Sequence, residues 1–306
     1  KQKESGAGRP EHSSLRDRAT VVANVKTGEI KTGITRVTSA EDALHVISPI
    51  GDNAQEVMVA LVLDKDGNVL QLVKHTKGLA DQSQVDVDHL IGSILDVPGA
   101  DTVYFAHNHP SGIPDQSHAD KRMTAKLKEV MVGTGLKSEG MLVTGDKGVG
   151  SIYNTEMDYE SRDITETKVV RNKIIPVTER IFQLREKLTD KKITSPETAA
   201  SIIADISKDR TGLVLMDNQN NPVSFIEMSL LELGALRTNS IDSGVGMVLR
   251  EIHATNSRAI MINVSKEDAK SKVKTENNIT NVTHFINSLG NTRIIDAFID
   301  GESGAS

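Results

Sequence analysis

The sequence contains no cysteine and no tryptophan, and aromatic residues make up only 3% of its 306 residues. Without cysteine the chain can form neither a disulfide framework nor a thiolate metal site, and it has no cysteine nucleophile. A reducing compartment fits this composition. Because aromatic side chains are so few, the hydrophobic cores must be built mainly from aliphatic residues.

Long apolar segments are also absent. No run of 18 apolar residues occurs, so we expect no transmembrane helix and no membrane partner. The polar opening has no apolar signal-peptide core, and its first residue, Lys1, indicates a piece cut from a longer polypeptide. The formal net charge of −6 argues against a general nucleic-acid binder, which usually has a basic excess, but leaves a local basic patch open.

A chain of this length is expected to form two domains. Apolar spacing and turn residues predict an α+β fold in the first half. Residues 19–34 indicate two short strands around a turn at Lys26–Glu29. The elements expected after them are a helix over 38–47, a hairpin over 56–76, a helix over 87–97, a strand over 101–110, a helix over 117–135 and a strand over 140–145.

The same order of segments recurs in the second half. Residues 194–203 resemble 38–47, residues 257–263 resemble 101–107, and both pairs are 156 residues apart. We interpret this spacing as a duplicated domain. The predicted divisions are a flexible lead-in over 1–18, a first domain over 19–152, a linker over 153–177, a second copy over 178–301 that begins with an extra helix over 178–188, and a tail over 302–306.

The stretch HNHPSGIPDQSHAD, which begins at residue 107, carries the strongest chemical signal. In a strand, His107 and His109 point to the same face. Pro110 then ends the strand, and Ser117 is a good N-cap for the next helix, with Asp120 in its first turn. Two imidazoles and one carboxylate form the three-ligand set typical of a catalytic zinc site.

The spacing His-x-His, seven residues, Ser, two residues, Asp resembles the JAMM motif of the JAB/MPN metalloproteases. The longer string HNHPSG resembles the bacterial RadC family within that group, and the resemblance covers roughly residues 38–150. It implies that His107, His109 and Asp120 hold Zn²⁺. It further implies that Glu56 is the general base and that Ser117 stabilises the oxyanion. No helix-hairpin-helix of the usual RadC kind precedes the motif.

The resemblance implies two tandem JAB/MPN-like, or cytidine-deaminase-like, domains, each a mixed sheet flanked by helices. At a spacing of 156 residues, Asn263 and Ser265 replace the two histidines and Glu276 replaces Asp120, so the second copy is expected to lack the metal site. It would serve as a substrate platform or a dimer partner, either within the chain or between chains. A location in the cytoplasm, of a bacterium or encoded by a mobile element, follows from the resemblance.

The function expected is a zinc-dependent hydrolase that cleaves a peptide or isopeptide bond, with a peptide or ubiquitin-like protein as substrate. The alternative is a non-enzymatic protein-interaction module associated with DNA repair or mobile-element machinery. A metal-dependent nuclease is a third hypothesis, which rests on the family name and is weakened by the acidic charge.

Overall fold

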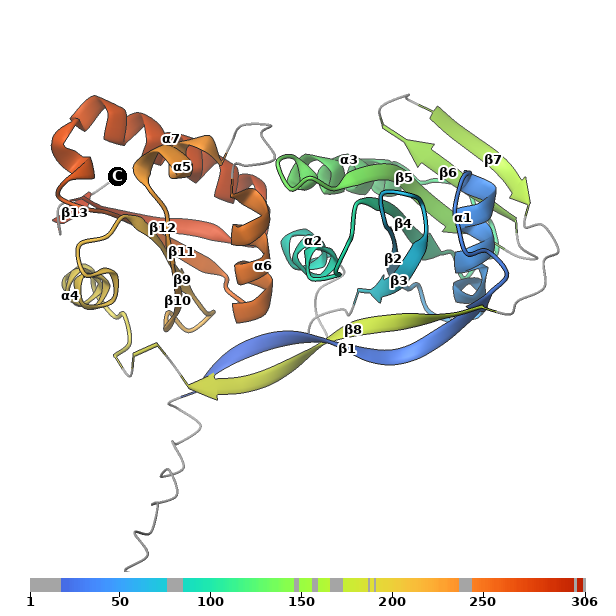
Figure 1. The fold of residues 1–306 in the computed structure, drawn as a ribbon, viewed down its shortest axis with the longest axis horizontal. Coiled ribbons are helices and arrows are strands. Elements are labelled where there is room, and N and C mark those ends of the chain that lie inside the picture. Colours follow the sequence, from blue (N-terminus) through green and yellow to red (C-terminus); the bar gives the residue numbers. More distant parts are fainter. Residues whose placement is uncertain are drawn as a thin grey trace, which may run out of the picture.

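The computed structural model describes residues 18–75, 85–145, 149–155, 159–165, 173–186, 188–189, 191–236, 244–299 and 302–304. Two mixed sheets flanked by helices make up an α+β fold, as the sequence predicted (Figure 1). The expected lead-in lies almost entirely outside the described residues. Within the described part of the chain, no helix has the length and apolar character needed to cross a membrane.

The larger sheet has eight strands in the order β1-β8-β3-β2-β4-β5-β6-β7. Its strands are β1 (Arg18–Thr32), β2 (Met58–Leu63), β3 (Val69–Lys74), β4 (Thr102–Asn108), β5 (Lys137–Thr144), β6 (Val149–Asn154), β7 (Tyr159–Thr165) and β8 (Lys173–Glu186). The helices of this half are α1 (Ala40–Ile47), the 3-10 turn η2 (Ser48–Asp52), α2 (Val87–Leu95) and α3 (His118–Met131).

Strand β2 is apolar at consecutive positions because both faces of the sheet are buried there. Val59, Leu61 and Leu63 are buried in a cluster with α1. Ala60 and Val62 point to the opposite face and are buried in a cluster with α2 and α3. Helices therefore cover both faces of the central strands, so the strand has no solvent face that would require polar residues. The predicted helices and hairpin between residues 38 and 135 are confirmed with shifts of a few residues at their ends.

The predictions that failed concern segments that form strands. Residues 18–32 form one strand, and the expected turn is a register shift between Lys26 and Gly28. The helix predicted over 178–188 is wrong, because residues 178–186 continue β8, which pairs antiparallel with β1 and parallel with β3. The expected linker contributes β7, and the expected tail contributes a short strand. For β1 and β8 the pairing partners are distant in sequence, and local spacing does not reveal such partners.

The smaller sheet has the order β10-β9-β11-β12-β13. Its strands are β9 (Gly212–Met216), β10 (Pro222–Glu227), β11 (Ala259–Val264), β12 (Arg293–Ile299) and β13 (Glu302–Gly304). The helices are α4 (Pro196–Ser207), α5 (Leu230–Ala235), α6 (Val245–Thr255), the 3-10 turn η4 (Asp268–Lys270) and α7 (Lys272–Ser288). Strand order and pairing directions match those of β3-β2-β4-β5-β6 in the larger sheet.

The two halves pack through α2 and α6, which lie side by side in the centre of the molecule (Figure 1). Buried residues of both helices belong to a single hydrophobic cluster. Next to them, the buried carboxylate of Asp86 accepts hydrogen bonds from Arg180, at 3.1 Å, from Arg258, at 2.9 Å for each of two nitrogens, and from Asn291, at 2.6 Å. An aliphatic surface and an ion cluster therefore join the halves.

The contact between α2 and α6 is closest at Gly92. A Cβ atom at this position would lie 2.4 Å from the Cβ of His253 and 2.6 Å from the carbonyl oxygen of Leu249. Gly92→Ala gains about 1 kcal/mol of helix propensity, but overpacking of a core costs typically about 1–3 kcal/mol. Because backbone must move, we expect a net loss of stability in urea unfolding. Gly246→Ala is the matched control, since its nearest neighbours would be 3.9 Å away. A more stable Gly92→Ala variant would contradict this packing.

The Asp86 ion cluster predicts a pH dependence of stability. Burial alone would raise the pKa of Asp86, but the hydrogen bonds and charge of Arg258 outweigh it and hold this pKa well below its usual range. Asp86→Ala should cost about 3–5 kcal/mol at pH 7, because the buried guanidinium group of Arg180 and the half-buried one of Arg258 lose their partner. The unfolded chain binds a proton near pH 4 and the folded chain does so only at lower pH, so wild-type stability falls as pH decreases through this window.

The difference in unfolding free energy between wild type and Asp86→Ala should therefore shrink from pH 7 to pH 3. Asp205→Ala is the control, because it removes only an exposed pair with Lys191 and should change stability little at any pH. A difference that is constant over the pH range would show that the carboxylate charge of Asp86 is not what joins the halves.

Candidate metal centre

The end of strand β4 presents the two histidines. His107 pairs with Met58 on β2 and Val143 on β5, so the sheet fixes its backbone on both sides. His107 is buried, and His109, just beyond the strand, is half-buried. The chain then turns: the amide of Gly112, at a φ of 77° that favours glycine, donates to the carbonyl oxygen of His109 at 2.9 Å. The turn directs the chain toward α3.

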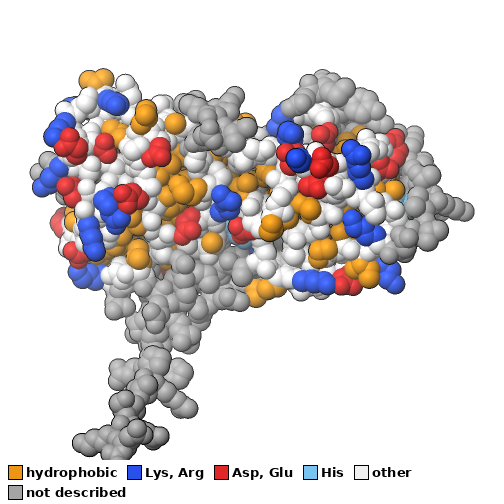
Figure 2. Space-filling model, in the orientation of Figure 1, with side chains coloured by type: hydrophobic (Ala, Val, Ile, Leu, Met, Phe, Trp, Pro, Cys, Tyr) orange, Lys and Arg blue, Asp and Glu red, His pale blue; other side chains and the backbone are white. Residues whose placement is uncertain are grey.

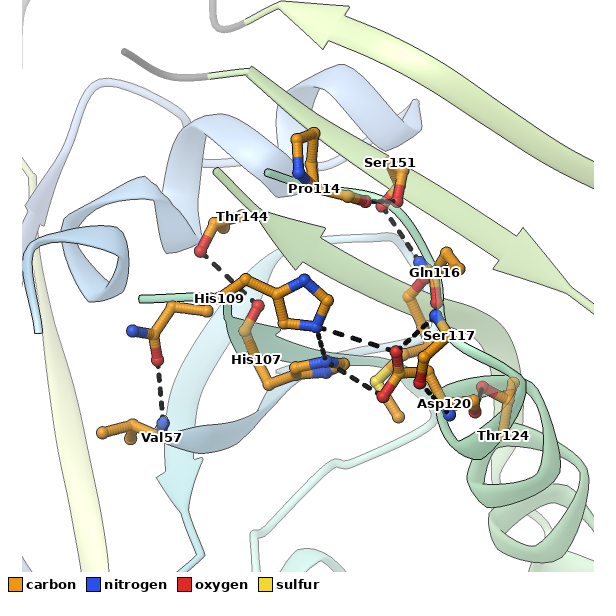
Figure 3. Close-up of polar contacts among 12 residues, drawn as sticks. Val57, His107, His109, Pro114, Gln116, Ser117, Asp120, Thr124, Thr144 and Ser151 are labelled. Atoms are coloured by element: carbon orange, nitrogen blue, oxygen red, sulfur yellow. Dashed lines mark hydrogen bonds and ion pairs between the residues drawn. The ribbon is translucent and has the colours of Figure 1, made fainter. Parts of the chain in front are cut away.

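The start of helix α3 supplies the carboxylate. The hydroxyl oxygen of Ser117 accepts a hydrogen bond from the amide of Asp120 at 3.1 Å. The Asp120 carboxylate in turn accepts one from the amide of Ser117 at 2.7 Å, which completes a capping box. The helix cap thus fixes the orientation of Asp120 as well as the helix start. Figure 3 shows this carboxylate directed at the two imidazoles.

The three side chains converge on one point. The Nε2 atoms of His107 and His109 are 3.1 Å apart. From Nε2 of His107 to Oδ1 of Asp120 the distance is 3.2 Å, and from Nε2 of His109 to Oδ2 of Asp120 it is 3.7 Å. Ligands in a tetrahedral zinc site, at 2.0–2.1 Å from the metal, lie about 3.3–3.4 Å from one another. The separations in this site fit that value, and all three side chains belong to one group able to hold a metal ion.

The protonation of the site also suits a cation. Nδ1 of His109 lies 2.8 Å from the carbonyl oxygen of Ile113, so Nδ1–H is the donor and the lone pair of Nε2 faces the site. Burial would raise the pKa of Asp120, but hydrogen bonds from His107 and Ser117 outweigh it and hold this pKa well below its usual range. The ionised carboxylate of Asp120 and the Nε2 lone pair of His109 are electron-rich donors of the kind a divalent metal requires, and His107 would become a third when metal displaces the hydrogen on its Nε2.

A cavity of about 420 Å³ adjoins two of the three candidate ligands, His107 and Asp120, and Glu56 lies on the same wall. Glu56 is exposed and stands in the segment between η2 and β2. The other residues that line the cavity are Gln55, Val57, Met58, Lys74, His75, Val85, Ala119, Met123, Met141 and Glu179. The structure therefore brings together all five residues singled out in the sequence, with Ser117 at the helix cap and Glu56 at the cavity.

Comparison with known proteins agrees with this geometry, since residues 37–157 match the family model of the RadC-like JAB domain. This part of the chain is a RadC-like JAB domain. A UPF0758 protein of Shewanella woodyi is 30% identical over 149 residues, which cover 48% of this chain and 65% of the relative. A UPF0758 protein of Shewanella piezotolerans is 33% identical over 107 residues, which cover 35% and 47%. The chain spans less than two thirds of the length of either relative.

Two features of the RadC-like JAB domain site were missed by sequence reasoning. The buried amide of Asn108, between the two histidines, bonds to the backbone of the Glu56 segment. Glu179, from β8, lines the cavity although it lies outside the matched residues, and its carboxylate is 3.8 Å from Lys74. An Asn between two ligands could have been noted in the sequence. The position of Glu179 depends on the pairing of β8 with β3, for which no local signal exists.

The smaller sheet has no such ligands at the corresponding place. Asn263 lies opposite Gly212 on β9, as His107 in the RadC-like JAB domain lies opposite Met58 on β2. The Asn263 amide donates to the carbonyl oxygen of Arg210 at 2.7 Å, and Ser265 stands where His109 would be. The third residue of α7 is Lys274, whereas the third residue of α3 is Asp120. In the described part of the chain, the His107, His109 and Asp120 group is the one able to hold a metal.

Proposed function

We propose that the RadC-like JAB domain is a zinc-dependent hydrolase that cleaves peptide or isopeptide bonds. One observation carries this proposal: two imidazole nitrogens and a carboxylate converge at separations suited to zinc, beside a cavity whose wall includes a further carboxylate, Glu56. Three protein ligands leave the fourth zinc position to water or substrate, which is typical of catalytic rather than structural sites.

The residues have distinct roles in this proposal. Zinc in the site supplies a water of lowered pKa and polarises the substrate carbonyl group. Glu56 takes the proton from the attacking water and delivers it to the leaving nitrogen. Ser117 uses its oxygen to accept the hydrogen bond from the Asp120 amide, so its hydroxyl hydrogen remains available to the oxyanion.

The cavity wall indicates which substrates fit. Met58, Met123 and Met141 form a flexible apolar part of the wall, which adapts to different aliphatic side chains. We therefore propose a peptide or ubiquitin-like protein with an aliphatic residue next to the bond that is cleaved. A nucleic-acid substrate has less support, because the net charge is −6 and cationic and anionic side chains are interspersed on the face drawn in Figure 2.

For the smaller sheet and its helices we propose a duplicated copy of the first domain that lost its ligands. The identical strand order and pairing directions of β10-β9-β11-β12-β13 and β3-β2-β4-β5-β6 support this proposal. The copy would also have a structural role, because its helix α6 covers the apolar surface of α2 in the first domain. A role as substrate platform would use the remaining surface of the copy.

The deciding experiment is elemental mass spectrometry of the purified chain, combined with a screen of fluorogenic peptides and ubiquitin-like isopeptide conjugates. The proposal expects about one zinc per chain and a cleavage that stops on addition of a chelator and resumes with zinc. A chain that takes up no metal when zinc is supplied would overturn it and favour the non-enzymatic interaction module. Zinc without cleavage of any conjugate would leave a structural metal site in place of an enzyme.

A further inference from the structure

We infer that Asn108 is a positioning residue that holds the Glu56 segment at a fixed place relative to the metal ligands. This inference rests on the proposed function, in which Glu56 is the general base. Asn108 is the last residue of β4, between His107 and His109, and its side chain is completely buried. Because side chains alternate along a strand, it faces away from the two imidazoles.

Both polar atoms of the Asn108 amide form hydrogen bonds with the Glu56 segment. Its Oδ1 accepts a hydrogen bond from the amide of Val57 at 2.8 Å. Its Nδ2 donates to the carbonyl oxygen of Asn53 at 2.9 Å and to that of Gln55 at 3.2 Å. An amide side chain has two donor hydrogens and an oxygen with two acceptor lone pairs, so these three bonds use both donors and one of the two lone pairs. Figure 3 labels Val57, whose amide donates the first of these bonds, near His107.

Two of these hydrogen bonds are formed with the two neighbours of Glu56, the proposed base. Gln55 and Val57 flank Glu56, and all three lie in a segment without helix or strand structure, so sheet hydrogen bonds do not fix it. Exposed segments with few backbone partners open easily. The hydrogen bonds of Asn108 take the place of the missing sheet bonds. Strand β4 therefore both presents the two histidines and holds the segment that carries Glu56. Since a displacement of about 1 Å at a reacting group can cost about 100-fold in rate, such a connection has a direct effect on catalysis.

The smaller sheet offers an internal comparison. Val264 follows Asn263 on β11 as Asn108 follows His107 on β4, and Val264 is buried in the hydrophobic cluster. In the smaller sheet, where the residue after Asn263 serves packing alone, this residue is therefore a valine. The polar amide stands only in the half that has metal ligands and a base to position.

The test compares Asn108→Val and the isosteric Asn108→Asp with wild type. Hydrogen exchange measured by mass spectrometry should become faster for residues 53–57 in both variants, while zinc content stays at about one per chain. With an active substrate, kcat should fall about 100-fold and KM should change little. Asn221→Ala is the control, because it removes another buried amide, bonded to Asp217 in the smaller sheet, and should lower the melting temperature without changing kcat.

A double-variant cycle separates positioning from mere folding. In a Glu56→Gln background, Asn108→Asp should cause no further loss of rate, because both changes remove the same contribution. Rate losses that multiply, or unchanged exchange at residues 53–57, would overturn the inference. If Glu56→Gln alone left the rate unchanged, the proposed role of Glu56 would fail, whereas the exchange result would still decide whether Asn108 holds this segment.

Discussion

Glu56→Gln should lower kcat by about 10²- to 10⁴-fold and leave about one zinc per chain, because general acid–base catalysis contributes a factor of this size. The three ligands belong to β4 and α3, whereas Glu56 belongs to the segment before β2. Ligation and proton transfer therefore depend on different elements. Glutamine retains the size and hydrogen-bonding ability of glutamate but has no carboxylate to accept a proton. Metal content and steady-state kinetics measured on the same preparation check both parts of this prediction.

Asp52→Asn provides the control for Glu56→Gln. It removes one negative charge from an exposed residue at the end of η2, and Asp52 does not line the cavity. We expect wild-type kinetics for this variant. Equal rates for Glu56→Gln and wild type would show that another group accepts the proton, and Glu179, on the wall of the same cavity, would be the first to test.

Replacement of both His107 and His109 by alanine should abolish zinc binding and, with it, all metal-dependent hydrolysis. A single carboxylate remains in this variant, and one oxygen ligand does not hold zinc against water. Zinc also stabilises any protein that binds it only when folded, by about 2.7 kcal/mol at a concentration 100 times its Kd. Added zinc should therefore raise the Tm of wild type and leave the Tm of the double variant unchanged.

His118→Ala is the matched control for the double variant, because His118 is an exposed histidine two residues before Asp120 and is not in the metal-holding group. It should keep both the zinc and the rise in Tm. Zinc uptake by the His107→Ala/His109→Ala variant at one ion per chain would contradict the site, since the metal would then lie elsewhere in the chain.

The sequence was sufficient to predict that His107, His109 and Asp120 form one group able to hold a metal, because all three lie within 14 residues. A strand end, a turn and a helix cap place these side chains together with little help from the rest of the chain. The helices α1, α2 and α3 were also predictable from their apolar spacing, and α1 and α3 from their N-caps as well. Burial on both faces explains why the strands β2 and β4 were recognised by continuous apolar runs.

The features that the sequence did not predict depend on contacts between segments that are distant in sequence. The residues 178–186 have a spacing compatible with a helix, but their backbone pairs with β1 and β3, which lie more than 100 residues earlier. The same pairing places Glu179 beside the cavity. The role of Asn108 could not be predicted either, since nothing in residues 107–120 indicates that its amide forms hydrogen bonds with residues 53–57.

Strand β8 has a practical consequence for the limits of an independently folding fragment. A fragment restricted to residues 37–157 would lack the partner of β3, and the backbone groups at Leu72–Lys74 that pair with Val177–Glu179 would be left open. Unprotected strand edges of this kind promote aggregation by pairing with other chains. A fragment that keeps the sheet around the candidate metal site paired must therefore include at least the start of β1 to the end of β8, residues 18–186, well beyond the residues that match the family model.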